Sequence, residues 1–290
     1  MGELLQHLFN GLMIGGVYAL MGIGLTLIFG VMRVVNWAHG EFYMLGAYML
    51  YTVSVLWGMP YLVALLVSAV ALFLFGVIVE RFLLRPVRNQ PADVAMLALV
   101  GLSIALASVA QVIWGAPAVS IQLPFPMVGI AVGPITLTPI RIFILATALT
   151  IIVGTHLFLQ RTRLGKATRA TFQDREVAAL MGININQINA LMFAAGAAIA
   201  AIAGGLLGPI FTLAPNMGAA ATAKSFAVVV TGGLGSFPGA ILAGLLLGIA
   251  ESYGTAYVSS GYREAIAFVM IIVVLLVKPT GLLGKTRRIG

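Results

Sequence analysis

The chain has 290 residues, of which 61% are hydrophobic and 8% charged, and its mean hydropathy is +1.10. A soluble domain carries roughly 25% charged residues, so this composition excludes a water-soluble protein and indicates an integral membrane protein. The net charge of +8 does not indicate nucleic-acid binding, because the basic residues stand at the ends of apolar runs, where they set membrane topology. Since the chain has no cysteine, it has no disulfide, thiolate metal ligand or cysteine nucleophile.

The first apolar run, Leu4 to Met32, contains no charged residue and is long enough to span a bilayer. Its many glycines predict close packing against another helix. A short polar segment, Asn36 to Glu41, follows. One interpretation is structural: Asn36 caps the next helix, and Glu41 is favoured by the dipole of its first turn. The other is functional: a broken or capped helix exposes Asn36, His39 and Glu41 to a permeation path or a partner subunit. These residues are too few for a metal site.

Further spans are predicted on both sides of a proline-rich loop. Phe42 to Val79 is uncharged and is divided by Gly58-Met59-Pro60, which predicts two spans and a short turn. Val94 to about Trp114 predicts one more span, and Ile142 to Gln160 another. Between them, Gly115 to Pro139 holds five prolines. This stretch predicts a non-cytoplasmic loop with a short hairpin.

A polar segment, Arg161 to Asn189, interrupts the apolar chain near its centre. Seven charged side chains fall between Arg161 and Glu176, so this segment must lie in water between two spans. Its excess of Arg and Lys places it on the cytoplasmic side. The next span is Ala190 to Gly208.

The inner part of this segment predicts a short exposed helix. Thr171 and Asp174 have the spacing of a capping box. Val177, Leu180 and Met181 then form an apolar ridge on one side. A glycine at position 182 predicts the C-terminal end of the helix. An exposed helix of about two turns with a small apolar face is suited to enter a groove in another protein.

The stretch from Ala219 to Tyr253 is interrupted by the glycine-rich sequence Gly232 to Gly239. This sequence lacks the Lys-Ser/Thr of a phosphate-binding loop, so we exclude a nucleotide site. It predicts either close helix packing or a hinge or path lining at Gly232, Gly233, Gly235 and Ser236. Lys224 and Glu251 interrupt long neutral runs. Ionisable residues within a membrane are functional candidates, but we expect both to lie at interfaces, where their side chains reach water. Arg263 and Glu264 predict an interfacial pair.

Together these features predict an all-α polytopic membrane protein, a single transmembrane domain of residues 1–290. We expect about eight membrane segments and a broken or re-entrant element near 219–239. The three basic segments lie on one side if the N-terminus is periplasmic and the C-terminus cytoplasmic, which requires an odd number of crossings.

Three sequences carry a family resemblance: GLTLIFGVMRVVNWAHGEFYMLGAY from Gly24, DREVAALMGI from Asp174 and VVTGGLGSFPGAILAGLLLG from Val229. Together they resemble the LivH-type permease subunit of branched-chain amino-acid ABC importers, over essentially the whole chain. The resemblance implies a bacterial inner-membrane protein that moves branched-chain or related amino acids. It also implies a second homologous permease, two cytoplasmic ATP-binding subunits and a periplasmic substrate-binding protein as partners. No cofactor is expected, because the ATPase is a separate chain.

The spacing of Glu176, Ala178, Ala179 and Gly182 resembles the EAA-like loop of ABC-importer permeases, whose helix docks on the ATPase. The resemblance therefore implies that the coupling residues are Asp174, Arg175, Glu176, Ala178, Ala179, Leu180 and Gly182. Two other classes are weighed against it. One is an ion-coupled secondary transporter that uses Glu41, Lys224 or Glu251. The other is an intramembrane enzyme, which the missing nucleophile and metal sets disfavour.

Overall fold

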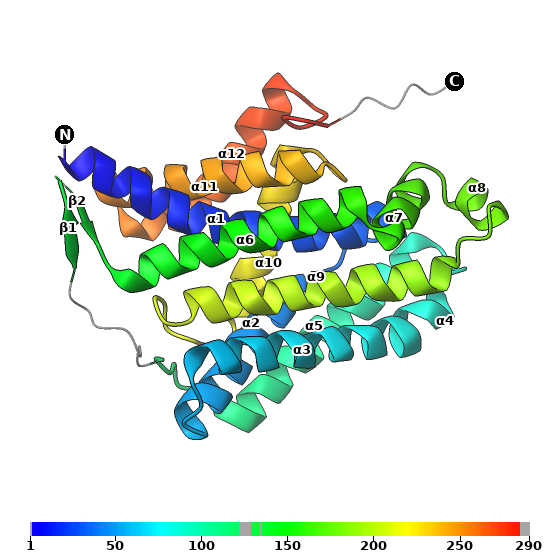
Figure 1. The fold of residues 1–290 in the computed structure, drawn as a ribbon, viewed down its shortest axis with the longest axis horizontal. Helices are drawn as coiled ribbons and strands as arrows, with labels where there is room; N and C mark the ends of the chain where they lie inside the picture. Colours follow the sequence, from blue (N-terminus) through cyan, green and yellow to red (C-terminus); the bar gives the residue numbers. More distant parts are fainter. Residues whose placement is uncertain (1, 122–128, 134, 285–290) are drawn as a thin grey trace.

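The computed structural model describes residues 2–121, 129–133 and 135–284, which form a bundle of helices (Figure 1). Seven of the described helices are long and apolar enough to cross a membrane. They are α1 (Gly2–Met32), α3 (Tyr61–Val79, continued by η2 Glu80–Leu84 and α4 Arg85–Val87), α5 (Ala92–Trp114), α6 (Pro139–Arg161), α9 (Ile185–Leu207), α11 (Phe237–Tyr257) and α12 (Arg263–Val277, preceded by η3 Ser260–Tyr262).

Two shorter helices complete the interior of the bundle. Helix α2 (His39–Tyr51) continues through a π-helical turn, η1 (Thr52–Leu56), and α10 spans Met217–Gly232. In Figure 1, α10 crosses the direction of the long helices instead of running along it. The described helices, including the short α10 and the break at Gly233 that follows it, confirm the predicted helical bundle with an interrupted element near 219–239.

The bundle has two distinct ends. One carries the N-terminus and the hairpin of β1 (Ile130–Val132) and β2 (Ile135–Leu137), which pair antiparallel and confirm the predicted hairpin. The other carries α7 (Arg163–Gln173) and α8 (Arg175–Leu180), and we call it the α8 end. The two ends of the described chain lie at opposite ends of the bundle, as an odd number of crossings requires. Which end faces the cytoplasm stays a prediction of the charge distribution.

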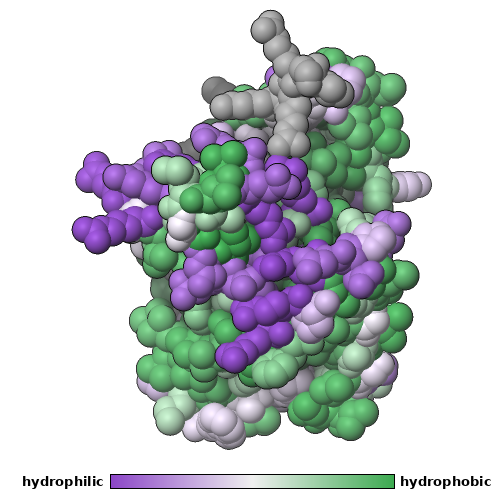
Figure 2. All heavy atoms as spheres, turned by 90° about the vertical axis from the view of Figure 1, so that its right-hand side faces the viewer, coloured by the Kyte–Doolittle hydropathy of each residue, from purple (hydrophilic) through white to green (hydrophobic). Residues whose placement is uncertain are grey.

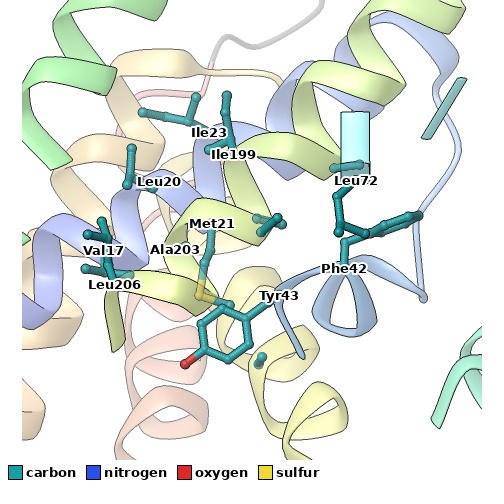
Figure 3. Packing of buried hydrophobic residues seen from close by; sticks show 14 of the residues in the cluster. Val17, Leu20, Met21, Ile23, Phe42, Tyr43, Leu72, Ile199, Ala203 and Leu206 are labelled. Atoms are coloured by element: carbon teal, nitrogen blue, oxygen red, sulfur yellow. The ribbon is translucent and has the colours of Figure 1, made fainter. Parts of the chain in front are cut away.

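Helix α1 lies at the centre because its glycines allow other backbones to approach. A Cβ on Gly15 would stand 2.8 Å from the Cα of Leu245 in α11, and one on Gly11 would stand 2.7 Å from the Cα of Ile249. Larger residues on the other faces of α1 fill the core with side chains from α2, α3 and α9 (Figure 3). Close packing through small residues is the main way in which membrane helices associate, and it confirms the packing predicted for the first span.

The last described residues close the α8 end of α10. Leu282 donates its backbone N–H to the carbonyl of Thr231 at 2.7 Å, and Leu283 donates to Gly232 at 3.0 Å. These carbonyls belong to the final turn of α10, where the helix itself supplies no donor. The predicted basic tail at Lys285–Arg288 lies outside the described residues.

Candidate functional site

Asp174 starts α8. Its Oδ1 accepts the backbone N–H groups of Glu176 at 2.9 Å and Val177 at 3.0 Å. Thr171 takes no part, because it is buried in α7 and donates its hydroxyl to the carbonyl of Ala167. The predicted capping box is therefore wrong, and Asp174 caps α8 alone. Helix α7 was not predicted from the sequence. It includes Thr171 and ends at Gln173, directly before Asp174.

The apolar ridge of α8 is exposed. Leu180 is 87% exposed and Met181 78%, whereas Ala178 is buried. The helix ends at Leu180 and is closed, as predicted, by Gly182, which has a φ of 83° and donates its N–H to the carbonyl of Ala179. Figure 2 looks onto the α8 end and shows a hydrophobic patch among hydrophilic side chains. This arrangement is a short apolar knob, Val177, Leu180 and Met181, on an otherwise polar surface.

A basic cavity of about 180 Å³ lies beside the knob. Arg33, Arg88 and Arg175 line it together with Asn189, whose amide is fully buried and has no hydrogen-bond partner among the described residues. Burial, and then the charges of Arg88 and Arg33, lower the pKa of Arg175 below its ordinary value. Sequence reasoning missed this cavity because its residues come from four separate segments.

The structure brings three of the predicted path residues together at the start of α2. His39 Nε2 lies 3.0 Å from the carbonyl oxygen of Met21, and Glu41 Oε1 accepts a hydrogen bond from Ser103 at 3.1 Å. Asn36 does not cap α2, which begins after Ala38. Its Oδ1 accepts the N–H of Ala38 instead. All three side chains are buried.

The start of α10 packs directly against the start of α2. Gly40 donates its N–H to Thr222 Oγ1 at 2.9 Å, and Gly218 leaves room for the carboxylate of Glu41. The second oxygen of that carboxylate has no hydrogen-bond partner among the described residues. The starts of two helices thus meet at one buried carboxylate.

The other predicted path residues lie elsewhere, in the turn between α10 and α11. Gly233 and Gly235 have φ values of 103° and 79°, which a residue with a side chain rarely adopts. Ser236 caps α11 by accepting the N–H of Gly239, and Gly232 packs against that glycine. Gly232 and Gly233 contact α11 and the last described residues, whereas a Cβ on Gly235 would meet nothing within 4 Å. A role in the path stays a prediction for all these residues.

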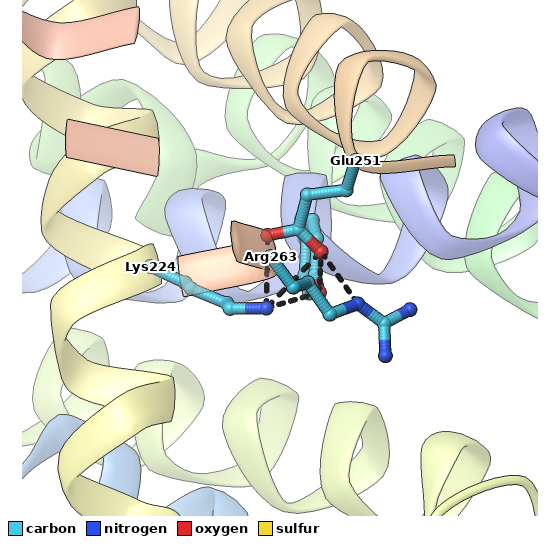
Figure 4. A network of polar contacts seen from close by, with 4 residues as sticks. Lys224, Glu251 and Arg263 are labelled. Carbon is cyan, nitrogen blue, oxygen red and sulfur yellow. Dashed lines mark hydrogen bonds and ion pairs between the residues drawn. The ribbon is translucent and has the colours of Figure 1, made fainter. Parts of the chain in front are cut away.

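Lys224, Glu251 and Arg263 form one buried ion cluster (Figure 4). Lys224 Nζ lies 2.8 Å from Glu251 Oε1, and Arg263 Nε lies 3.2 Å from Glu251 Oε2. Tyr18 donates its hydroxyl to the same carboxylate at 2.7 Å. Glu251 is fully buried within the chain, so the expectation that its carboxylate reaches water at a membrane interface is wrong. The predicted ion pair between Arg263 and Glu264 is also wrong, because the guanidinium of Arg263 pairs with the carboxylate of Glu251.

This cluster borders the larger of two described cavities, which has a volume of about 380 Å³. Its walls come from α1, α2, α10, the end of α9 and the start of α12. Tyr18, Lys224, Arg263 and Glu264 supply polar groups, and Met21, Tyr43, Leu207, Phe211 and Met217 supply most of the apolar surface. A cavity with apolar walls and a few grouped charges is a typical small-molecule site.

Comparison with known proteins agrees with this arrangement. Residues 7–275 match the family model described as "Branched-chain amino acid transport system / permease component". The chain is 36% identical to the high-affinity branched-chain amino acid transport system permease protein LivH of Escherichia coli K12, and 37% identical to BraD of Pseudomonas aeruginosa, which has the same description. Both matches cover 97% of this chain and 96% of the relative.

A solved structure shares the fold. PsaBC from Streptococcus pneumoniae, in complex with Fab, aligns with a TM-score of 0.50 at 11% identity and covers 93% of this chain and 91% of that chain. At this identity the match shows the arrangement of helices alone. The extent of the family match and the identity to both permeases decide the assignment: this chain belongs to the permease family of branched-chain amino-acid transport systems.

Proposed function

We propose that the chain is the membrane-spanning subunit of an ATP-driven importer, that it carries branched-chain or related amino acids inward, and that separate subunits hydrolyse the ATP. The observation that carries this proposal is the apolar knob on α8, whose ridge is 55% to 87% exposed at Val177, Met181 and Leu180. Three large apolar side chains on a polar surface are suited to a groove in a partner protein. These three side chains contribute little to packing within the described part of the chain.

The attachment of α8 supports a coupling role. Helix α7 folds back on α6, where Gly165 fits against the backbone carbonyls of Phe158 and Leu159. Helix α8 is followed directly by α9, which packs against α1, α2 and α3. A displacement of α8 by closing ATPase subunits would therefore pass to α6 and α9, and through α9 to α2, where Asn36, His39 and Glu41 lie. The coupling residues are Asp174, Arg175, Glu176, Ala178, Ala179, Leu180 and Gly182.

The partners follow from the same assignment. The α8 end is cytoplasmic and takes two ATP-binding subunits, a second homologous permease lies beside the chain in the inner membrane, and a periplasmic binding protein docks at the hairpin end. Substrate affinity resides mainly in that receptor, because a permeation site must also release its cargo.

The buried carboxylate of Glu41 keeps one alternative open. Its second oxygen has no described partner, which is also expected of an ion-coupling site in a secondary transporter. Uptake driven by an ion gradient through the purified chain alone would establish that alternative. Dependence of uptake on ATP and on the partner subunits would exclude it.

A substitution on α8 tests the proposal in the complete, reconstituted assembly. Ala179 is exposed on α8, and Asn89 is exposed at the same end of the bundle, between α4 and α5 and outside the lining of the basic cavity. Ala179→Glu should leave membrane insertion intact but abolish amino-acid uptake while ATP hydrolysis continues, because the charge enters the docking groove. Asn89→Glu is the matched control and should retain uptake. Normal uptake by the Ala179→Glu assembly would contradict the coupling role.

A further inference from the structure

We propose that the 380 Å³ cavity binds a neutral aliphatic amino acid as a zwitterion, with its carboxylate on Arg263 and its ammonium on Glu264. This inference rests on the proposed function, because it names where the cargo pauses inside the permease. A pocket of several hundred cubic ångströms is of the size that small ligands occupy.

The charges around the cavity match a zwitterion. Lys224 and Arg263 share the buried carboxylate of Glu251, and Glu264 in the cavity wall adds a second negative charge, so the four groups carry no net charge. Lys224 is held in place, because its Nζ also contacts the hydroxyl of Tyr18 at 2.8 Å. A buried charge without a partner is costly, so a ligand with a net charge would be disfavoured here. A zwitterionic amino acid places its carboxylate at Arg263 and its ammonium at Glu264 and adds no net charge.

Arg263 has the free edge that such a carboxylate needs. Its Nε is used by Glu251, and its guanidinium carbon lies 4.7 Å from the ring centroid of Phe211. The two terminal nitrogens point away from Glu251 in Figure 4, and no interaction among the described residues uses them. A guanidinium that is fixed through its Nε and has both terminal nitrogens unpaired can bind a carboxylate through two parallel hydrogen bonds.

The rest of the cavity matches the remainder of the ligand. Glu264 lines the same cavity and is exposed to it, so it can accept hydrogen bonds from an ammonium group. Met21, Leu207 and Met217 form apolar walls, and methionine adapts to branched and unbranched aliphatic shapes. A charged side chain on the ligand would face these walls without a partner and would be disfavoured.

The test uses the absence of native cysteine. In the assembly of this chain with its second permease and ATPase subunits, without the binding protein, Ala220→Cys places one thiol in this chain, in the cavity wall. L-Leucine should slow maleimide labelling of that thiol. Leucinol, which lacks the carboxylate, and 4-methylpentanoate, which lacks the ammonium, should give no protection. Val258→Cys, at a position that is 73% exposed and not in the cavity lining, is the control and should label at the same rate throughout.

Two further variants separate the roles of the charges. Adding Arg263→Gln should abolish protection by leucine, and Arg263→Lys should restore part of it. Because Arg263 also pairs with Glu251, a second variant is needed in case the first does not assemble. Glu264→Gln, on an exposed residue, should weaken protection by leucine and reduce the discrimination against 4-methylpentanoate. Equal protection by leucinol, absence of protection by leucine, or full protection in Glu264→Gln would each overturn the inference.

Different results would contradict the cavity as the amino-acid site and the chain as an importer subunit. If the complete assembly takes up leucine in an ATP-dependent manner but leucine never protects Ala220→Cys, this cavity is not the site and the importer assignment stands. If the complete assembly takes up no amino acid, the proposed function fails whatever the labelling shows.

Discussion

Helices α1 and α12 are almost equally apolar and are packed in opposite ways. The span at α1 has a mean hydropathy of 2.1 and 89% of it is buried within the chain, whereas the span that contains α12 has a hydropathy of 2.0 and is 6% buried. Hydropathy therefore shows that a helix enters the membrane and leaves open whether it faces protein or lipid.

Glycine explains most of the difference. Gly11, Gly15, Gly22 and Gly24 in α1 each meet another helix at a distance that a Cβ would not fit, while α12 contains no glycine and buries only Ala267. At its start α12 makes a charge contact, Arg263 with Glu251, and farther along it packs Ala267 and Met270 against the core. One region is thus fixed by close backbone contacts and the other by an ion pair and a few side chains, and this contrast can be tested.

The largest effect is expected at the glycine contact. Gly15→Leu would place its Cβ 2.8 Å from the Cα of Leu245, and a side-chain movement cannot relieve an overlap with backbone. We expect a loss of more than about 4 kcal/mol of stability, seen as failure to yield folded protein in detergent. Gly101→Leu is the matched control, because a Cβ there meets nothing within 4 Å. Equal yields from the two variants would contradict the role of glycine in fixing α1.

A smaller effect is expected at the ion pair. Glu251→Gln leaves Lys224 and Arg263 without their shared counter-charge, which should cost about 3–5 kcal/mol and lower the thermal unfolding midpoint. Combining it with Lys224→Met should recover part of the loss, because one buried cation is removed. The control is Glu3→Gln at the exposed start of α1, which should leave the midpoint unchanged. An unchanged midpoint in Glu251→Gln would mean that α12 is held by other contacts.

The smallest effect is expected on the outer face of α12. Phe268 is 53% exposed, so Phe268→Ala in the isolated chain should change stability by less than about 0.5 kcal/mol. In a packed core the same change costs about 3–5 kcal/mol. Unfolding in detergent with and without the variant measures the difference. A core-sized loss would show that α12 packs more tightly than its exposure indicates.

Local signals explain what could be predicted from sequence. Helices α1, α5, α6 and α9 lie within a few residues of their predicted bounds, because an apolar run and its charged ends are visible within one segment of sequence. The end of α8 just before Gly182 and the hairpin of β1 and β2 are also set by residues close to each other in the sequence, and both are as predicted.

What could not be predicted depends on contacts between distant segments. Lys224 and Glu251 each looked like interfacial charges, because only the packing of α10 against α11 brings them together. The same holds for Asn189, which is buried beside Arg33 and Arg88 although it stands at the end of a polar segment. Glu41 was selected from sequence, but its contact with Ser103 and its proximity to Gly218 depend on α5 and α10.

The closure of α10 by Leu282 and Leu283 has a consequence for biosynthesis. Thr231 and Gly232 emerge from the ribosome well before the two leucines that bind their carbonyls. In hydrocarbon an unsatisfied carbonyl is costly, so the end of α10 needs water or a translocon wall until residues 282 and 283 have been synthesised. Nascent chains that stop before Leu282 should therefore keep this end of α10 open to proteases, and the helix is closed only after residues about fifty positions later in the chain have left the ribosome.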